Sequence, residues 1–195
     1  MVYRFYDFDE TLALTKTALY RAYKKALAEY DITFDIDYFT DFIYVDATKY
    51  LKETCNFSEA EIAEIKSMKE AYYLDDFFDD IVWNWPDISL MDTYVIVTNT
   101  RKELVEKLLQ EYDMRNMTNM AGVFKVIGAY SSNVTYKRKP DPELYEVAFQ
   151  TYIQRMRKTD ELHIYEDSPE GLLAAASFLN AFKKRISKFY LHHII

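Results

Sequence analysis

The chain has 195 residues, of which 50% are hydrophobic and 29% are charged. This length can bury one sizeable core and a small second lobe, which excludes a long multidomain assembly. Lys and Arg total 24 against 32 Asp and Glu, giving a formal net charge of -8, and the most basic runs, at 137–139 and 183–185, are short. Such a chain repels phosphate backbones, so we expect no nucleic-acid partner.

The single cysteine, Cys55, excludes an internal disulfide. The first ten residues include acids where a signal peptide would need an apolar run, and no stretch reaches the ~18 apolar residues of a membrane-spanning helix. We therefore expect a cytoplasmic protein with no membrane partner. The sequence does not indicate an oligomeric state.

The first part of the chain predicts one strand followed by helices. Residues 2–6 are a short β-prone run that ends at the polar segment 7–11. Apolar residues then recur at helical spacing over 19–30 and, less regularly, over 38–51. Ser58 and Glu61 have the spacing of a capping box, and apolar residues follow it on one helical face. Residues 16–88 are therefore expected to be mostly helical, with no strand among them.

From residue 89 onward, short apolar runs alternate with amphipathic segments. Strands are predicted at 94–97, 123–129, 162–165 and 189–195, and helices at 104–112, 142–152 and 171–182. This alternation is typical of a parallel sheet covered by helices on both faces. We therefore predict an α/β core made of residues 1–15 and 89–195, interrupted by a helical insertion at 16–88.

Polar residues follow the predicted strands where an open parallel sheet binds its ligands, beyond the carboxyl ends. In chain order they are Asp7, Asp9, Thr98, Asn99, Lys139, Glu166 and Asp167. Carboxylates from two strand ends can hold a hard divalent cation, and one carboxylate can act as a nucleophile. A hydroxyl, an amide and a lysine can hold phosphate oxygens. Each residue alone has an ordinary structural explanation, such as a helix cap or a loop lysine, so the prediction depends on their common placement.

Four motifs in the chain resemble those of the haloacid dehalogenase superfamily of aspartate-nucleophile hydrolases. Residues 7–12 are similar to the first motif, D-x-D-x-T-L. Residues 95–99 are similar to the second motif, a run of apolar residues that ends in T-N. The K-P-x-P-x-x-[FY] motif is similar to 139–145, and E-D-S-x-x-G to 166–171. The insertion lies where the phosphoglycolate phosphatase and β-phosphoglucomutase branch carries its helical cap. The resemblance covers the whole chain and implies a Rossmann-like parallel sheet flanked by helices, with the cap inserted after the first strand.

The resemblance also implies the catalytic and metal-binding roles. Asp7 would attack phosphorus to form an aspartyl-phosphate, and Asp9 would protonate the leaving group and later take a proton from water. Mg²⁺ would be bound by Asp7, by the backbone carbonyl of Asp9, by Asp167, and by Glu166 directly or through water. Because carbon–halogen cleavage needs no such acid, Asp9 favours phosphate chemistry over dehalogenation.

The remaining roles concern the phosphoryl group of the substrate. The resemblance implies that Thr98 and Asn99 donate hydrogen bonds to its oxygens and that Lys139 pairs with them and with Asp7. Lys139 stands beside two other basic residues, and only its position matches the K-P-x-P pattern. The expected partner is a small phosphorylated substrate.

We therefore predict a Mg²⁺-dependent phosphatase. One alternative is phosphoglucomutase-like transfer of the phosphoryl group to a sugar hydroxyl, which the E-D-S form of the fourth motif favours slightly. Another is a catalytically silent protein that binds a phosphate ligand, which is suggested by Glu10, because relatives commonly have glycine there. Without glycine, the tight backbone after Asp9 must be formed by a residue that tolerates it less well. The chain also has Leu14, where relatives often have an aspartate before the hydroxyl residue Thr15.

Overall fold

The computed structural model describes residues 1–153 and 156–195, which form two compact units. The first unit contains Met1–Ala13 and Asn84–Ile195, and the second contains Leu14–Trp83. The sequence predicts the change between core and insertion at 15/16 and 88/89, whereas the units change at 13/14 and 83/84.

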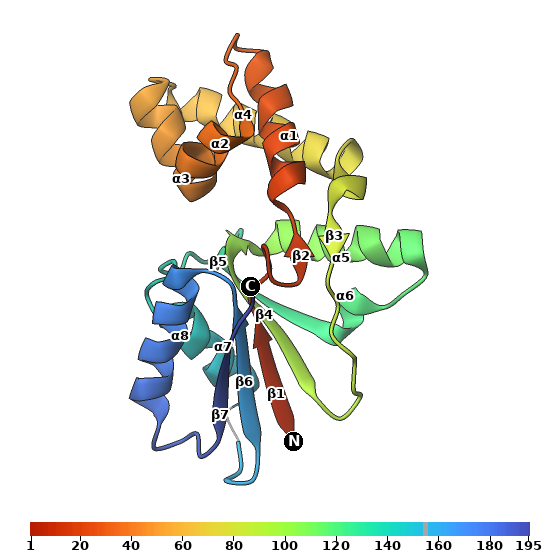
Figure 1. Ribbon diagram of the computed structural model, residues 1–195, viewed down its shortest axis with the longest axis vertical. Coiled ribbons are helices and arrows are strands. Elements are labelled where there is room, and N and C mark those ends of the chain that lie inside the picture. The colour runs from red at the N-terminus through yellow and green to blue at the C-terminus, as the bar shows by residue number, and fades with distance from the viewer. Residues whose placement is uncertain (154–155) are drawn as a thin grey trace. The chain divides into compact units, whose positions relative to one another are not determined.

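The first unit is built on a five-stranded parallel sheet with the order β5-β4-β1-β6-β7 (Figure 1). The prediction of an α/β fold with a parallel sheet is confirmed. Its strands are β1 (Val2–Tyr6), β4 (Thr93–Arg101), β5 (Phe124–Tyr130), β6 (Glu161–Glu166) and β7 (Phe189–His193). Its helices are α5 (Lys102–Asn116), α6 (Met120–Val123), α7 (Glu143–Tyr152) and α8 (Pro169–Phe182).

The strand order places a topological switch at the centre of the sheet. The chain runs from β1 to β4 and β5 on one side, and then returns to β6 and β7 on the other side. In open parallel sheets the ligand crevice forms at such a reversal, beyond the carboxyl ends of the strands. The ends of β1, β4 and β6 are therefore the expected place for a functional site.

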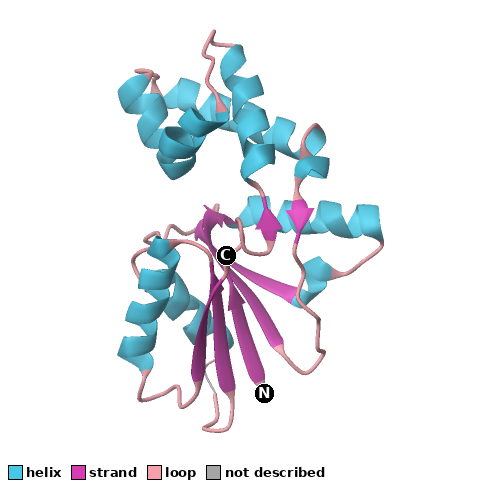
Figure 2. Cartoon of the chain, viewed as in Figure 1, coloured by secondary structure: helices cyan, strands magenta, loops and turns pink. Residues whose placement is uncertain are grey.

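Helices pack on the faces of the sheet and bury its central strands, whereas the edge strand β7 is mostly exposed (Figure 2). On one face, α7 and α8 contribute Tyr145, Phe149 and Phe178 to a core that also contains Phe5 and Val95. On the other face, α5 packs against β4 and β5. The middle of β4 is buried without interruption, which explains its continuous apolar sequence. Burying each large apolar side chain contributes roughly 1.5–3 kcal/mol, so this core holds the strand ends firmly in place.

The second unit is mostly helical, as predicted. Its helices are α1 (Lys16–Ala28), α2 (Ile36–Tyr38), α3 (Tyr44–Lys49) and α4 (Glu59–Asp75), with π-helical turns at Phe39–Ile43 and Tyr50–Thr54 and a 3₁₀ turn at Phe78–Asp80. The predicted capping box is present, because the Ser58 side chain accepts the Glu61 N–H while the Glu61 carboxylate accepts the Ser58 N–H. Asp46 has a non-helical backbone inside α3, and this break, with the π-helical turns, accounts for the irregular spacing over 38–51.

One expectation for residues 16–88 is wrong, because a strand does occur there. β3 (Val82–Trp83) pairs with β2 (Ala13–Leu14) in a two-stranded sheet. Strands of two residues are too short to produce an alternating pattern, so periodicity could not reveal them. Among the described residues, no helix is both long and apolar enough to cross a membrane.

Candidate active site

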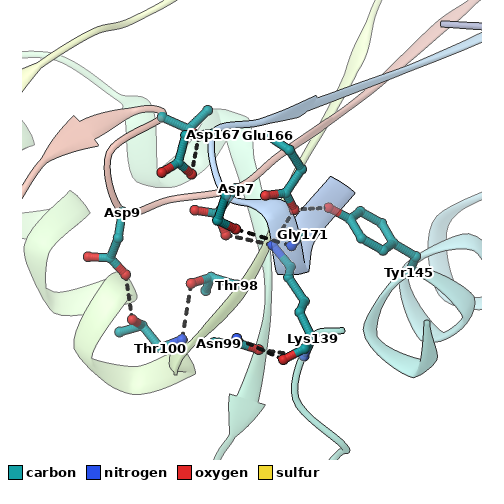
Figure 3. Close-up of polar contacts among 12 residues, drawn as sticks. Asp7, Asp9, Thr98, Asn99, Thr100, Lys139, Tyr145, Glu166, Asp167 and Gly171 are labelled. Carbon is teal, nitrogen blue, oxygen red and sulfur yellow. Dashed lines mark hydrogen bonds and ion pairs between the residues drawn. The ribbon is translucent and has the colours of Figure 1, made fainter. Parts of the chain in front are cut away.

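The predicted site residues meet at the carboxyl ends of three adjacent strands (Figure 3). Asp7 and Asp9 follow β1, while Thr98 and Asn99 lie near the end of β4. Glu166 is the last residue of β6, Asp167 is the next residue, and Lys139 comes from the segment between β5 and α7. Residues as far apart in the sequence as 7 and 167 are therefore brought to one edge of the sheet.

The loop after β1 carries the carboxylates of Asp7 and Asp9, and burial of the residue between them, Phe8, fixes the position of the loop. Phe8 is fully buried, and its carbonyl accepts the N–H groups of Leu12 and Ala13 at 3.0 and 3.1 Å. The chain makes this tight turn at Glu10, whose φ of 62° lies in the left-handed region. The expected backbone strain at Glu10 is thus present, because side chains with a Cβ disfavour that region.

The centre of the site is a cluster of buried polar side chains, Asp7, Lys139, Tyr145 and Glu166, which we call the buried cluster. The Lys139 ammonium donates to Asp7 Oδ1 at 2.6 Å and to Glu166 Oε1 at 2.5 Å. The Tyr145 hydroxyl also donates to Glu166 Oε1. Glu166 is completely buried, and Lys139 is 6% exposed. Two carboxylates therefore share one ammonium away from water, which leaves negative charge uncompensated.

Burial and the neighbouring charges together shift the pKa values of the buried cluster. Burial raises the pKa of Asp7, and the negative charge of Glu166 raises it further, although Lys139 acts in the opposite direction. Burial likewise raises the pKa of Glu166. Burial alone would lower the pKa of Lys139, but its two carboxylate partners outweigh this effect and raise it. Lys139 is therefore held in its charged form.

The buried cluster and Asp167 fit a hard divalent cation. Asp7, Glu166 and Asp167 each offer a carboxylate oxygen, and these atoms lie within 4.8 Å of one another. Glu166 Oε2 is buried without a hydrogen-bond partner, and a Cβ at Gly171 would collide with it. Closely spaced carboxylate oxygens with uncompensated negative charge are typical Mg²⁺ ligands.

Thr98 and Asn99 lie beside the buried cluster, but their side chains make different contacts. Asn99 Oδ1 accepts the Lys139 N–H at 2.8 Å, and Asn99 Nδ2 donates to the Lys139 carbonyl at 3.5 Å. The Asn99 side chain thus orients Lys139, and its donation to a phosphate remains a prediction. Thr98 Oγ1 accepts the Thr100 N–H at 3.0 Å, so the Thr98 hydroxyl proton is still available for a ligand.

Hydroxyl groups of three further residues donate to predicted carboxylates, and sequence reasoning gave none of these residues a role. Tyr145 contacts Glu166 as described above, Thr11 Oγ1 donates to Asp167 Oδ1 at 3.2 Å, and Thr100 Oγ1 donates to Asp9 Oδ2 at 2.5 Å. Thr11 and Tyr145 occupy fixed letters of the D-x-D-x-T-L and K-P-x-P-x-x-[FY] patterns, so the motifs themselves contained a signal. Thr100 lies one residue beyond the T-N motif, so no motif indicated a role for it.

Solved structures share this fold at low sequence identity. CbbY from Rhodobacter sphaeroides in complex with phosphate has a TM-score of 0.68 and 19% identity, covering 90% of this chain and 82% of that chain. A proposed phosphoglycolate phosphatase from Lactobacillus plantarum has a TM-score of 0.66 and 21% identity, covering 98% and 86%. A proposed phosphatase from Clostridium difficile has a TM-score of 0.63 and 13% identity, covering 98% and 94%.

Comparison with protein families gives a more specific result than the fold alone. A search of curated proteins finds no match. The family described as haloacid dehalogenase-like hydrolase matches residues 5–178, which include all the predicted site residues. This range is most of the chain, and it confirms the resemblance carried by the four motifs. The chain belongs to the haloacid dehalogenase-like hydrolase family.

Proposed function

We propose that the protein is a Mg²⁺-dependent phosphatase that hydrolyses a small phosphorylated metabolite through an aspartyl-phosphate on Asp7. The observation that carries this proposal is the Lys139 ammonium between Asp7 and Glu166, with an oxygen of Asp167 nearby. An ammonium in contact with a carboxylate nucleophile can also attract the phosphate that the nucleophile must approach.

The reaction has two steps, and the chain supplies groups for both. In the first step, an Asp7 oxygen attacks phosphorus while the bond to the ester oxygen breaks, and Asp9 gives its proton to the departing alkoxide. In the second step, Asp9 takes a proton from water as that water attacks phosphorus, and the bond to Asp7 breaks to release phosphate. Thr98 and Lys139 hold the phosphoryl oxygens throughout. Asp7, Glu166 and Asp167 would hold the Mg²⁺, which would supply positive charge that reduces the repulsion between the Asp7 carboxylate and the phosphate.

The class of substrate is supported by the similar structures. One structure of CbbY contains phosphate, and a structure of a CbbY mutant contains xylulose-1,5-bisphosphate. A small phosphorylated molecule is therefore the substrate class that we propose for this chain. The comparisons favour neither the mutase alternative, which the E-D-S motif suggests, nor the silent binder, which Glu10 suggests.

The test is a screen of phosphate release from sugar phosphates, nucleoside monophosphates, phosphoglycolate and pyridoxal phosphate, with Mg²⁺ or with EDTA. We expect hydrolysis of at least one of these in Mg²⁺, loss of activity in EDTA and recovery when Mg²⁺ is returned in excess. Turnover that survives exhaustive chelation would refute the metal requirement. Conversion of a sugar phosphate to an isomer without phosphate release would instead identify a mutase.

The matched variant is Asp7→Asn, which is nearly isosteric and cannot form the acyl phosphate. We expect it to lose hydrolysis while keeping the thermal unfolding transition of a folded protein. If Asp7→Asn kept a tenth of the wild-type kcat on a good substrate, Asp7 would not be the nucleophile.

A further inference from the structure

We propose that Thr100 is a positioning residue for Asp9, holding its carboxylate where it exchanges protons with the leaving group and with water. This inference rests on the proposed function, because it concerns how the acid of that reaction is oriented. Thr100 lies at the end of β4 outside the recognised motif, and it contacts Asp9 across 91 positions of sequence. The contact joins the ends of neighbouring strands β4 and β1.

The geometry of the contact is that of a strong hydrogen bond. Thr100 Oγ1 donates to Asp9 Oδ2 at 2.5 Å, within the short range typical of a hydroxyl bonded to a carboxylate (Figure 3). Both residues are half-buried, so water competes less for this carboxylate than at an open surface. The Thr100 hydroxyl can therefore favour one orientation of the Asp9 side chain.

An irregularity in the sheet sets the position of Thr100. β4 pairs with β5 in register up to Thr98 opposite Gly128, and the next pair is Arg101 opposite Tyr130. β4 thus contains one more residue than β5 across this interval, which is the definition of a β-bulge. Bulges bend a strand and redirect its side chains, and they are frequent beside active sites.

Gly128 makes room for this bulge. A Cβ at Gly128 would lie 2.5 Å from the Thr100 carbonyl oxygen and 2.6 Å from the Lys102 nitrogen, which are backbone atoms that cannot rotate away. The chain has only three glycines, so the use of one at this contact indicates a specific steric demand. The position of Thr100 is therefore fixed by the sheet itself.

Thr100 holds two proposed catalytic-site residues through different groups. Its backbone N–H donates to Thr98 Oγ1, while its hydroxyl donates to Asp9. These two functions can be separated, because a side-chain substitution removes the second contact and leaves the first. Thr100→Val keeps the shape of the side chain without the hydroxyl, and Thr100→Ser keeps the hydroxyl without the methyl group.

The kinetic experiment compares these two variants on an alkyl phosphate that the wild type hydrolyses. Misplacing a catalytic group by about 1 Å can cost up to ~10²-fold, so we expect Thr100→Val to lower kcat by roughly 10- to 100-fold with KM changed less than about threefold. Thr100→Ser should restore kcat to within about threefold of wild type. Equal losses in both variants, or a loss confined to KM, would overturn the proposal.

Two further comparisons test whether Thr100 acts through Asp9. On p-nitrophenyl phosphate, whose leaving group needs little protonation, the Thr100→Val loss should shrink to less than about threefold. In an Asp9→Asn background, Thr100→Val should lower kcat by no more than about twofold further, because the group it positions has already lost its function. Independent, multiplicative losses would overturn the proposal.

A structural measurement separates this proposal from the proposed function. In crystal structures, the Asp9 carboxylate should adopt a different side-chain orientation in Thr100→Val and keep the wild-type orientation in Thr100→Ser. An unmoved Asp9 in Thr100→Val would refute the positioning role, whatever the activity. A wild-type protein that releases no phosphate from any ester would instead refute the phosphatase, while the crystal structures would still decide whether Thr100 positions Asp9.

Discussion

The site has two halves, the buried cluster and a rim beside it, and different interactions hold the side chains of each half. The buried cluster is shielded from water and is tied by an ammonium that contacts two carboxylates. The rim, which we define as Asp9, Thr100 and Asp167, is half-buried, and hydroxyl groups hold its carboxylates. In the buried cluster, removing the Lys139 ammonium leaves two carboxylates uncompensated away from water. At the rim, the same kind of change removes only one hydrogen bond.

This difference agrees with the catalytic role that we propose for each half. A nucleophile and the ligands of a cation need fixed positions, which strong interactions among buried charges provide. An acid that first gives and then takes a proton must remain in contact with the substrate and with water. The comparison predicts that changes in the buried cluster will affect both folding and activity, and that changes at the rim will mainly affect activity.

The largest effect is expected from Lys139→Met, which removes the only ammonium in the buried cluster. Breaking a buried ion pair typically costs about 3–5 kcal/mol, so the free energy of unfolding should fall by an amount of that order. Activity should fall by more than ~10³-fold, because the phosphate loses the ammonium that contacts the nucleophile. The control is Lys137→Met, an exposed lysine of the same loop, which should change unfolding by less than about 0.5 kcal/mol.

The stability loss in Lys139→Met should depend on pH. Burial already raises the folded-state pKa values of Asp7 and Glu166, and removing Lys139 raises them further. The folded state then keeps protons that the unfolded chain has released, so its stability decreases as pH rises above the ordinary carboxyl range. Urea unfolding in EDTA should show a larger deficit at pH 8 than at pH 5. A deficit independent of pH would mean that uncompensated carboxylate charge is not its cause.

Among changes at the rim, Asp9→Asn should produce the largest catalytic effect, and it leaves the buried cluster intact. General acid–base catalysis is typically worth ~10²–10⁴-fold, so kcat on alkyl phosphates should fall within that range. The loss should shrink for p-nitrophenyl phosphate, and Mg²⁺ binding measured by calorimetry should persist. Equal losses on both substrates together with lost Mg²⁺ binding would make Asp9 a structural or metal-binding residue.

The sequence predicted residues of both halves, but it missed one partner in each, Tyr145 in the buried cluster and Thr100 at the rim. Residues at strand ends were predictable, because a parallel sheet brings its carboxyl ends together and the short apolar runs located the strands. The order of motifs then identified Asp7, Asp9, Lys139, Glu166 and Asp167 as neighbours. Partners that depend on side-chain direction or on strand register were not predictable.

Particular residues show why. Thr100 reaches Asp9 through a bulge, and a bulge is a property of two paired strands that neither segment reveals alone. Tyr145 is a residue of α7, and only the packed structure shows that its hydroxyl contacts Glu166. Gly128 and Gly171 can be read from the sequence, but only the folded structure shows what a side chain would meet there: the backbone of Thr100 and Lys102 at Gly128, and the Glu166 carboxylate at Gly171.

Tyr145→Phe sharpens the comparison, because it removes a single hydroxyl from the buried cluster. Hydrogen bonds to charged groups contribute about 1.5–3 kcal/mol, so unfolding should become easier by about that amount. We expect kcat to fall by roughly tenfold, since Glu166 and Lys139 would retain their mutual contact. Tyr130→Phe, at an exposed tyrosine, is the control for loss of a phenol hydroxyl. A stability as high as that of wild type would show that the Tyr145 contact contributes nothing.

The smallest effect is expected at the turn that links the two halves, in the variant Glu10→Gly. A left-handed backbone costs a residue with a Cβ roughly 1–2 kcal/mol, whereas glycine adopts it freely but loses about 0.5–1 kcal/mol through the greater freedom of the unfolded chain. The free energy of unfolding should therefore rise by no more than about 1 kcal/mol. Asp31→Gly, at another left-handed position with φ of 57°, should show a gain of similar size and is the matched control.

Because the carboxylates of Asp7 and Asp9 keep their partners in Glu10→Gly, kcat should stay within about threefold of wild type. A large fall in kcat without loss of stability would mean that the strained turn itself holds Asp9 in position, and that Thr100 is not sufficient to orient it.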